Sequence, residues 1–417
     1  MKIKTIKKDY TRVINLKREK HIKPIKPPFI MRALVRVLSI PDLWRVRFSY
    51  TGKLPKTAGL VLMNHSSFLD LKIASKIFFP RAYGIVCTTD ALIGKKWLMR
   101  FIGCIPTRKF VSDYSLISDI KYMLTKNAHV LMYPEAGYSF DGTKTVLPKK
   151  FGLLLKRLDV PVYYIGTSGA FLHDPLYNGL RLRKVKVTAS VKTLLTREQI
   201  KSMSVDQIDA VVNDAFSFDA FLEQQQNKIK ISEPFRAIGL ERILYKCPHC
   251  MAEGKTKGEG DTLVCNECGK KWQLTEYGKM EAADGNTEFE HIPDWFEWQR
   301  AEVLKEIESG SYCIKSKVKI GMIVNYKAFY EVGEGELTHT NNGFEITGCN
   351  GKLNYTQAAG ATHTLNADWF WYEKGDVISI GDTDALYYCF VESGVSVAKA
   401  RLATEELYKI AKQKKGK

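Results

Sequence analysis

The sequence predicts an α/β domain with a mixed sheet flanked by helices, followed by a small cysteine-rich module and a β-rich C-terminal domain. Short apolar strands alternate with helical patterns from residue 50 to about 195, which is typical of an α/β domain. Two Cys-x2-Cys pairs then begin at Cys247 and Cys265. Strand-like alternation dominates residues 313–393. The chain has 417 residues, too many for one ordinary core, so we expect two or three domains.

Composition and charge limit the class of protein. An apolar fraction of 45% and an aromatic fraction of 11% are typical of a globular protein and exclude a disordered chain. The net charge is +18, and residues 1–56 supply +13 of it, from 16 Lys and Arg against Asp9, Glu19 and Asp42. A basic segment of this kind binds polyanions, either nucleic acid or an anionic lipid surface. Nine cysteines, an odd number, indicate a reducing compartment.

Residues 1–49 predict a basic arm and an amphipathic helix that lies on a membrane surface. Residues 1–28 are rich in lysine and predict a flexible or partly helical arm. Over residues 29–44 an apolar face is interrupted by arginines and ends in Trp44, which suits a lipid interface. The alternative is a helix packed on its own domain with its arginines in solvent. No uncharged apolar run reaches about 18 residues and no signal-peptide core is seen, so we expect no transmembrane helix.

The α/β domain is expected to span residues 50–245. Four short apolar runs predict strands, at 58–63, 82–87, 129–133 and 160–166. Periodic patterns predict helices at 68–79, 91–102, 113–126 and 147–158. Chemistry gathers at the carboxyl ends of the strands in open α/β sheets. The turn at Asn64–His65 and the loop from Pro134 to Ser139 each follow a strand, so we expect these two loops to share one edge of the sheet.

The first of these loops places a histidine and an aspartate five residues apart. Five residues turn about 500° along a helix, so His65 and Asp70 meet only if His65 lies on a loop and Asp70 on the first helical turn. The carboxylate can then hold the imidazole in one tautomer and leave its other nitrogen free to take a proton. The pair is two-thirds of a serine-hydrolase triad with no evident serine, and the hydroxyl could belong to the substrate. The alternative is a loop histidine beside a helix-capping aspartate.

With this motif and the blocks that follow it, the sequence resembles the glycerolipid acyltransferases, best known as 1-acylglycerol-3-phosphate acyltransferases. The resemblance covers about residues 30–195. Its first block matches fully, since Asn64, His65 and Asp70 fall on the family motif N-H-x4-D. The resemblance implies that His65 is the general base, that Asp70 orients it and that Asn64 belongs to the substrate site.

The second block departs slightly from the family pattern. It reads G-C-I-P-T-R-K from residue 103, with Lys109 at the position where the family has an arginine and Arg108 one residue earlier. The resemblance implies that this position binds the phosphate of the acceptor. Either cation could do so, an arginine through two hydrogen bonds and a lysine as a point charge.

The third block departs more. It reads E-A-G-Y-S from residue 135, where the family reads E-G-T-R-S. Glu135 and Ser139 keep their family positions and are expected in the substrate site, whereas Tyr138 replaces a phosphate-binding arginine. Lys149 and Lys150 fall where the family has a lysine-rich segment, and could make up the lost charge at the start of the next helix.

The two Cys-x2-Cys pairs predict a zinc ribbon over residues 246–280. Each pair offers two thiolates, and four thiolates complete a tetrahedral zinc shell. A site with four protein ligands is closed, so we expect a structural rather than a catalytic ion. The expected ligands are Cys247, Cys250, Cys265 and Cys268. Redox cysteines or a disulfide pair are the alternative.

The remaining chain predicts a helical linker over residues 281–312 and a β-rich domain over residues 313–417. Turn signals at Asn341–Gly343 and at Asn350–Gly351 predict hairpins. A last helix is expected at about 395–412. Several strands capped by one C-terminal helix resemble a pleckstrin-homology barrel.

The resemblance implies an O-acyltransferase that moves a fatty acyl group from a thioester to a lysophospholipid, with 1-acylglycerol-3-phosphate as the expected acceptor. Acyl-CoA or acyl carrier protein is the expected donor, and no catalytic cofactor is required. The protein is expected to be cytoplasmic and peripheral, bound to the anionic cytoplasmic face of a membrane. One alternative is a basic zinc-ribbon protein that binds nucleic acid, although its cysteine knuckles have no aromatic residue between them for stacking. The other is a catalytically inactive lipid-binding scaffold.

Overall fold

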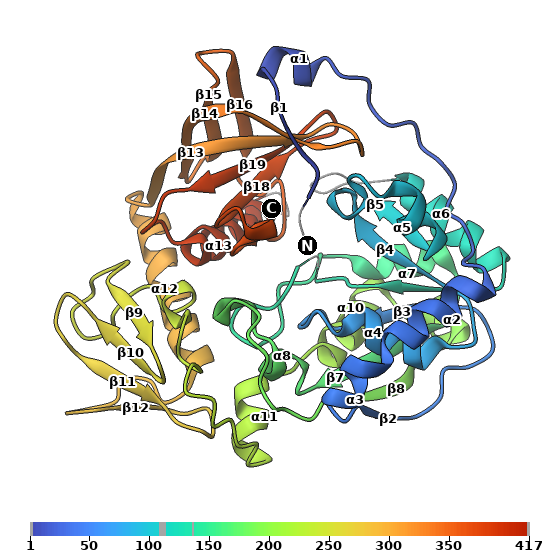
Figure 1. Ribbon diagram of the computed structural model, residues 1–417, viewed down its shortest axis with the longest axis horizontal. Coiled ribbons are helices and arrows are strands. Elements are labelled where there is room, and N and C mark those ends of the chain that lie inside the picture. The colour runs from blue at the N-terminus through green and yellow to red at the C-terminus, as the bar shows by residue number, and fades with distance from the viewer. Residues whose placement is uncertain (1–2, 108–113, 136, 415–417) are drawn as a thin grey trace.

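The structure is a computed structural model that describes residues 3–107, 114–135 and 137–414. Three sheets organise these residues: a seven-stranded sheet in the α/β domain, a four-stranded sheet in the cysteine-rich module and an eight-stranded sheet near the C-terminus. In Figure 1 the α/β domain lies on the right, the cysteine-rich module at the lower left and the C-terminal sheet at the upper left.

The α/β sheet is mixed, as predicted. Its strand order is β2-β8-β7-β3-β6-β4-β5, in which the pair β7–β8 is antiparallel and the other neighbouring pairs are parallel. The central strand β3 is fully buried because alternate residues, Val61 and Met63 against Leu60 and Leu62, pack into two cores on opposite faces. The strands are β2 Ser49–Thr51, β3 Leu60–Met63, β4 Tyr83–Thr88, β5 Cys104–Thr107, β6 His129–Met132, β7 Val162–Ser168 and β8 Thr188–Leu195.

The helices of this domain follow the predicted pattern with one change. The helix expected over 91–102 is divided, since a 3-10 turn at Thr89–Leu92 precedes α5 and Gly94 between them has φ +72°. Strands β2, β5 and β8 were not predicted; β5 is short and contains Pro106, which weakens a strand pattern. The helices are α4 Asp70–Phe78, α5 Lys96–Phe101, α6 Tyr114–Thr125, α7 Phe151–Leu158, α8 Ala170–His173, α9 Arg197–Ser202, α10 Val205–Ala215 and α11 Ala220–Gln226.

The N-terminal segment is partly helical, which is one of the two forms predicted for it, and it contacts both the C-terminal sheet and the α/β domain. Strand β1 (Thr5–Lys7) pairs in parallel with the start of β14 (Phe329–Thr340), and helix α1 (Tyr10–Ile14) follows β1. The chain then crosses to the α/β domain (Figure 1). There the expected amphipathic helix divides at Ser39 into α2 (Phe29–Leu38) and α3 (Ile40–Arg45). No helix in the described ranges combines the length and the apolar character needed to cross a bilayer.

The cysteine-rich module is an antiparallel sheet packed against a long helix. Its strands are β9 Thr256–Glu259, β10 Thr262–Cys265, β11 Lys271–Leu274 and β12 Met280–Ala282, and the helix is α12 Ile292–Ser309. Trp295 of α12 is fully buried, and its Nε1 donates to the backbone carbonyl of Lys246 (3.0 Å). The side-chain oxygen of Gln299 accepts from the backbone N–H of Lys246 (2.9 Å). Part of the segment expected to be a linker therefore belongs to the core.

The C-terminal sheet consists of two antiparallel meanders joined by the pair β13–β19. Both predicted hairpins are present, as β14–β15 and β15–β16. The predicted last helix is α13 (Val397–Lys414). The pleckstrin-homology barrel stays a prediction. The strands are β13 Cys313–Ile323, β14 Phe329–Thr340, β15 Gly343–Gly348, β16 Leu353–Ala358, β17 Asn366–Asp368, β18 Val377–Gly381 and β19 Leu386–Val391.

Candidate active site

The predicted contact between His65 and Asp70 is present at the carboxyl end of β3. His65 lies on the loop that follows the strand, Asp70 begins α4, and His65 Nδ1 lies 2.7 Å from Asp70 Oδ2. The same oxygen accepts from the backbone N–H groups of Ser66 (3.3 Å) and Ser67 (3.5 Å). Burial raises the pKa of Asp70, against the hydrogen bond and charge of His65. With Nδ1 held by the carboxylate, Nε2 is the ring nitrogen left for proton transfer.

The loop after β6 lies against the His65 loop, as predicted. Glu135 Oε2 accepts from the backbone N–H of His65 (2.7 Å), and Oε1 accepts from the Thr145 hydroxyl and N–H (3.4 Å each). The Ser139 N–H donates to the carbonyl of His65 (3.2 Å), and its hydroxyl donates to the carbonyl of Thr143 (2.6 Å). Glu135 and Ser139 thus join the two loops by hydrogen bonds within the protein. Their role in substrate binding stays a prediction.

Glu135 gives the site a pH dependence that can be measured. It is fully buried, and desolvation raises its pKa to about 7, against the hydrogen bonds from His65 and Thr145. Between about pH 4.5 and 7, Glu135 is therefore protonated in the folded state and ionised in the unfolded state. The contribution of Glu135 to the free energy of unfolding is complete below about pH 4.5 and is lost as the pH rises through about 7. The shift corresponds to at most about 3 kcal/mol.

Glu135→Gln tests this dependence, because the amide stays neutral at every pH. We expect the free energy of unfolding of the wild type, minus that of the variant, to fall as the pH rises from 4.5 to 8 in urea unfolding. Asp174, whose pKa burial also raises to about 7, titrates in both proteins and cancels from the difference. A difference that does not vary with pH would contradict the assignment.

The structure describes three of the other five predicted substrate residues. Asn64 is buried, and its side-chain oxygen accepts from the N–H (2.8 Å) and the hydroxyl (3.0 Å) of Thr167, which ties the end of β3 to β7. Lys149 and Lys150 are exposed and directly precede α7. Arg108 and Lys109 lie outside the described residues.

Aromatic rings cover both faces of the His65 imidazole, a feature that sequence reasoning missed. The ring centroid of Tyr133 lies 4.2 Å from that of His65 and the centroid of Tyr138 lies 3.9 Å from it, with interplanar angles of 27° and 30°. Phe68 stacks on the outer face of Tyr138 at 5.2 Å. The only signal in the sequence is that two tyrosines flank residues 134–137. The two rings cover the faces of the imidazole, whose nitrogens lie at its edge.

The four predicted zinc ligands lie together, with their ligand atoms all within 4.8 Å of one another. The Sγ atoms of Cys247 and Cys268 are 3.9 Å apart, and those of Cys250 and Cys265 are 3.7 Å apart. Four Zn–S bonds of about 2.3 Å at tetrahedral angles place the sulfurs about 3.8 Å apart, whereas a disulfide needs about 2.05 Å. The residues therefore fit a tetrahedral metal ion and not a pair of disulfides. A zinc ion bound there would link the two Cys-x2-Cys pairs and would supply no catalytic chemistry.

Comparisons with known proteins agree with the motif in the α/β domain. A family model described as Acyltransferase matches residues 45–166. No curated protein matches the chain. One matching solved structure is the crystal structure of the 1-acyl-sn-glycerophosphate (LPA) acyltransferase PlsC from Thermotoga maritima, with 14% identity over 44% of this chain and 76% of that chain and a TM-score of 0.36. The family model is therefore the comparison that identifies the domain. Residues 45–166 are thus similar to the acyltransferase family, and the N-H-x4-D motif with His65 and Asp70 lies within the matched range.

Proposed function

We propose that the protein is an O-acyltransferase that moves a fatty acyl group from acyl-CoA or acyl carrier protein to the hydroxyl of a lysophospholipid, with 1-acylglycerol-3-phosphate as the leading acceptor. This reaction belongs to phospholipid synthesis. The observation that carries the proposal is the 2.7 Å contact that fixes His65 Nδ1 on Asp70 at the edge of the sheet. It leaves one imidazole nitrogen to act on an external hydroxyl.

The reaction needs only groups that the chain and its substrates supply. His65 Nε2 takes the proton of the acceptor hydroxyl as the oxygen attacks the thioester carbonyl. Asp70 stabilises the resulting imidazolium, and the rings of Tyr133 and Tyr138 lie on its two faces. The new C–O bond forms, the C–S bond breaks, and the departing thiolate takes the proton from Nε2. No covalent acyl-enzyme is required.

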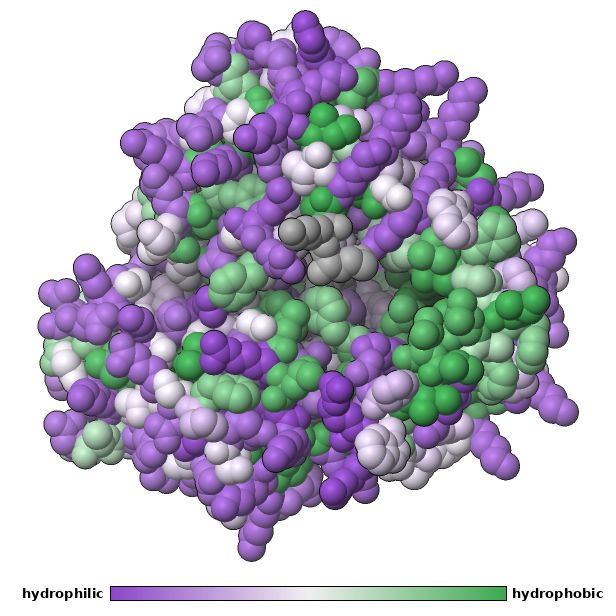
Figure 2. Space-filling model, in the orientation of Figure 1, coloured by the Kyte–Doolittle hydropathy of each residue, from purple (hydrophilic) through white to green (hydrophobic). Residues whose placement is uncertain are grey.

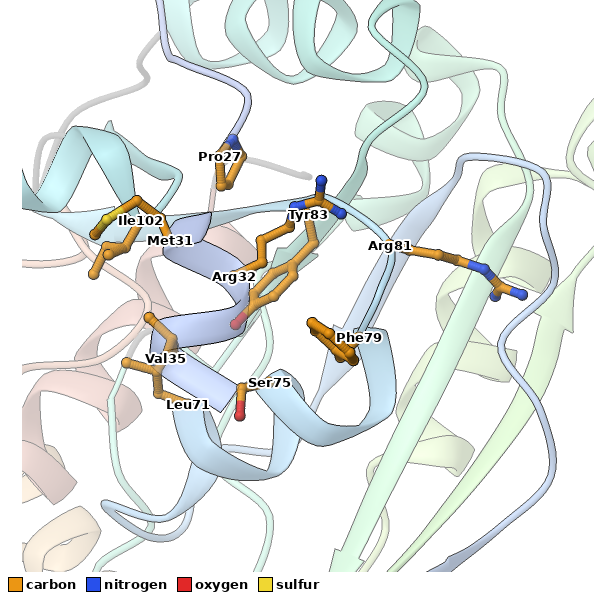
Figure 3. A pocket seen from close by; sticks show the side chains of 10 residues that line it. All are labelled: Pro27, Met31, Arg32, Val35, Leu71, Ser75, Phe79, Arg81, Tyr83 and Ile102. Atoms are coloured by element: carbon orange, nitrogen blue, oxygen red, sulfur yellow. The ribbon is translucent and has the colours of Figure 1, made fainter. Parts of the chain in front are cut away.

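An apolar, basic surface supports binding to an anionic membrane. Figure 2 shows hydrophobic side chains gathered over α2 and α3, where Ile30 is 77% exposed and Trp44 is 82% exposed. Arginines interrupt the same helices, and basic residues near an anionic surface each contribute about 1 kcal/mol to binding. A small pocket lies between α2 and α4, and its lining combines apolar side chains such as Met31 and Leu71 with Arg32 and Arg81 (Figure 3). Neither His65 nor Asp70 lines this pocket, so it is not part of the catalytic pair.

Ile30→Asp is expected to weaken binding to vesicles of phosphatidylglycerol about tenfold. Burial of one such side chain contributes about 1.5–3 kcal/mol, and 1.4 kcal/mol is a factor of ten. Vesicle co-sedimentation measures the change, and added salt should weaken binding of the wild type further. The matched control is Leu222→Asp, which places the same charge at an exposed leucine of α11. Equal binding by both variants, or binding that salt does not change, would refute a membrane role for α2.

The acceptor is identified by offering purified protein acyl-CoA and a panel of acceptors, with the products weighed by mass spectrometry. The panel contains 1-acylglycerol-3-phosphate, lysophospholipids with other headgroups and glycerol phosphate. We expect a product heavier than the acceptor by one acyl group, with 1-acylglycerol-3-phosphate used fastest. No acylated product from any acceptor, with acyl-CoA or with acyl carrier protein, would rule out the enzyme and favour the scaffold.

A further inference from the structure

We infer that the C-terminal domain completes the active site, with Arg401 of α13 as a positioning residue that holds the Tyr138 ring against His65. The inference rests on the proposed function, since it gives the domain a part in the same acyl transfer. It concerns the region beyond residue 166, where the acyltransferase family model ends.

Arg401 contacts the loop after β6 in two ways. Its Nη1 donates to the backbone carbonyl of Tyr138 (3.0 Å), although 263 positions separate the two residues. Its guanidinium carbon lies 4.2 Å from the centroid of the Phe140 ring. That ring also contacts Trp369, with the centroids 4.1 Å apart. Phe140 and Trp369 are buried, so the C-terminal domain holds this loop at its backbone and at a neighbouring side chain.

A buried ionic network fixes Arg401 itself. Arg401 Nε donates to Glu405 Oε1 (3.2 Å), which also accepts from the Thr364 hydroxyl (2.7 Å). Glu405 Oε2 accepts from Arg300 Nη1 (2.8 Å) on α12. Buried ionic groups gain little stability over apolar ones of similar size, so stability alone is a weak reason for such a network. Here the network holds Arg401 Nε and leaves Nη1 to donate to the loop after β6.

The held loop reaches the proposed general base. Tyr138 stacks on the imidazole of His65 at 3.9 Å, opposite Tyr133. A stacked ring restricts rotation of the imidazole about its own side-chain bonds, and that rotation would break the 2.7 Å contact with Asp70. A misplacement of about 1 Å can cost about a hundredfold in rate. Arg401 can therefore affect the reaction without touching a substrate.

The test compares Arg401→Met, Arg401→Lys and Tyr138→Leu with the control Tyr312→Phe. Methionine keeps much of the volume of Arg401 but cannot donate, lysine restores one donor, and leucine removes the stacked ring while leaving Arg401 in place. The control removes a buried hydrogen bond to His339 (2.8 Å) in the same domain, at a position that does not contact the loop. Each variant is checked by thermal unfolding before use.

The readout is the rate at which diethyl pyrocarbonate modifies His65, followed by peptide mass spectrometry, with the exposed His249 of the same chain as internal standard. This readout needs no substrate. We expect His65 to react about tenfold faster in Arg401→Met and Tyr138→Leu, with Arg401→Lys between them and the wild type and Tyr312→Phe unchanged. In acyl transfer, the same two variants should lose about ten- to a hundredfold in kcat with little change in KM.

Unchanged modification of His65 in a folded Arg401→Met variant would overturn the inference, even if Tyr138→Leu reacts faster. So would an equal rise in Tyr312→Phe, since it would reflect general loosening of the domain. If Arg401→Met fails to fold, Arg401→Lys and Tyr138→Leu still decide the question. Absence of acyl transfer in the wild type, together with the expected modification rates, would reject the proposed function and leave the positioning role of Arg401 intact.

Discussion

Replacing His65 with alanine is expected to lower the kcat of acyl transfer about a thousandfold, because the acceptor hydroxyl then has no positioned base to take its proton. Binding of the two substrates depends on other groups, so KM should change much less. The rate is measured as ester formed from acyl-CoA and the preferred acceptor. Thermal unfolding checks that the variant is folded, and some loss of stability is expected because only 21% of the His65 side chain is exposed and two tyrosine rings pack on it.

The chain supplies a matched control in a second histidine–aspartate pair. His21 Nε2 lies 2.9 Å from Asp119 Oδ2, on the N-terminal segment that crosses to the α/β domain. His21→Ala removes the same kind of contact and should leave the rate of acyl transfer unchanged. Near wild-type turnover in His65→Ala, or equal losses in the two variants, would contradict the role of His65.

Removing the metal is expected to unfold the cysteine-rich module. Structural zinc contributes about 10–16 kcal/mol to folding in zinc-finger peptides, which is as large as or larger than the whole free energy of unfolding of most domains. Cys247 and Cys265 are fully buried, beside the Trp272 and Trp295 rings, whose centroids are 5.0 Å apart. A strong chelator should therefore expose these tryptophans and shift their fluorescence to longer wavelength. Metal analysis of the purified protein should give one zinc per chain.

Cys265→Ser and Cys313→Ser separate loss of a ligand from loss of any thiol. Cys313 is exposed on β13 and lies outside the cluster. We expect Cys265→Ser to lose zinc and to show the fluorescence of the chelated protein, and Cys313→Ser to behave as the wild type. Purified protein without zinc, or identical unfolding of the two variants, would reject the zinc ribbon.

The sequence predicted the parts of the fold that depend on neighbouring residues, such as single strands, tight turns and ligand spacing. Apolar runs marked β3, β4, β6 and β7, and turn residues marked the two hairpins of the C-terminal sheet. The contact between His65 and Asp70 followed from one turn between a strand and a helix. The cysteine cluster followed from ligand spacing.

Contacts between distant segments could not be read in this way. Nothing in the residues around Thr5 indicates pairing with β14, and nothing near Arg401 indicates the backbone of Tyr138. The aromatic helix α12 was read as a linker because amphipathic periodicity does not say which surface a helix covers. In the sequence, Tyr138 stands where the family has a phosphate-binding arginine, so it was read only as the loss of that ligand. The structure shows that the Tyr138 ring stacks on His65.

Direct transfer from thioester to hydroxyl is tested by following acyl-CoA consumption and ester formation together in one reaction. If His65 acts as a base on the acceptor, thioester is consumed only when the acceptor is present, one ester appears for each thioester lost, and His65→Ala does neither. Consumption of thioester without an acceptor, with an acyl group retained on the protein by mass, would contradict that mechanism.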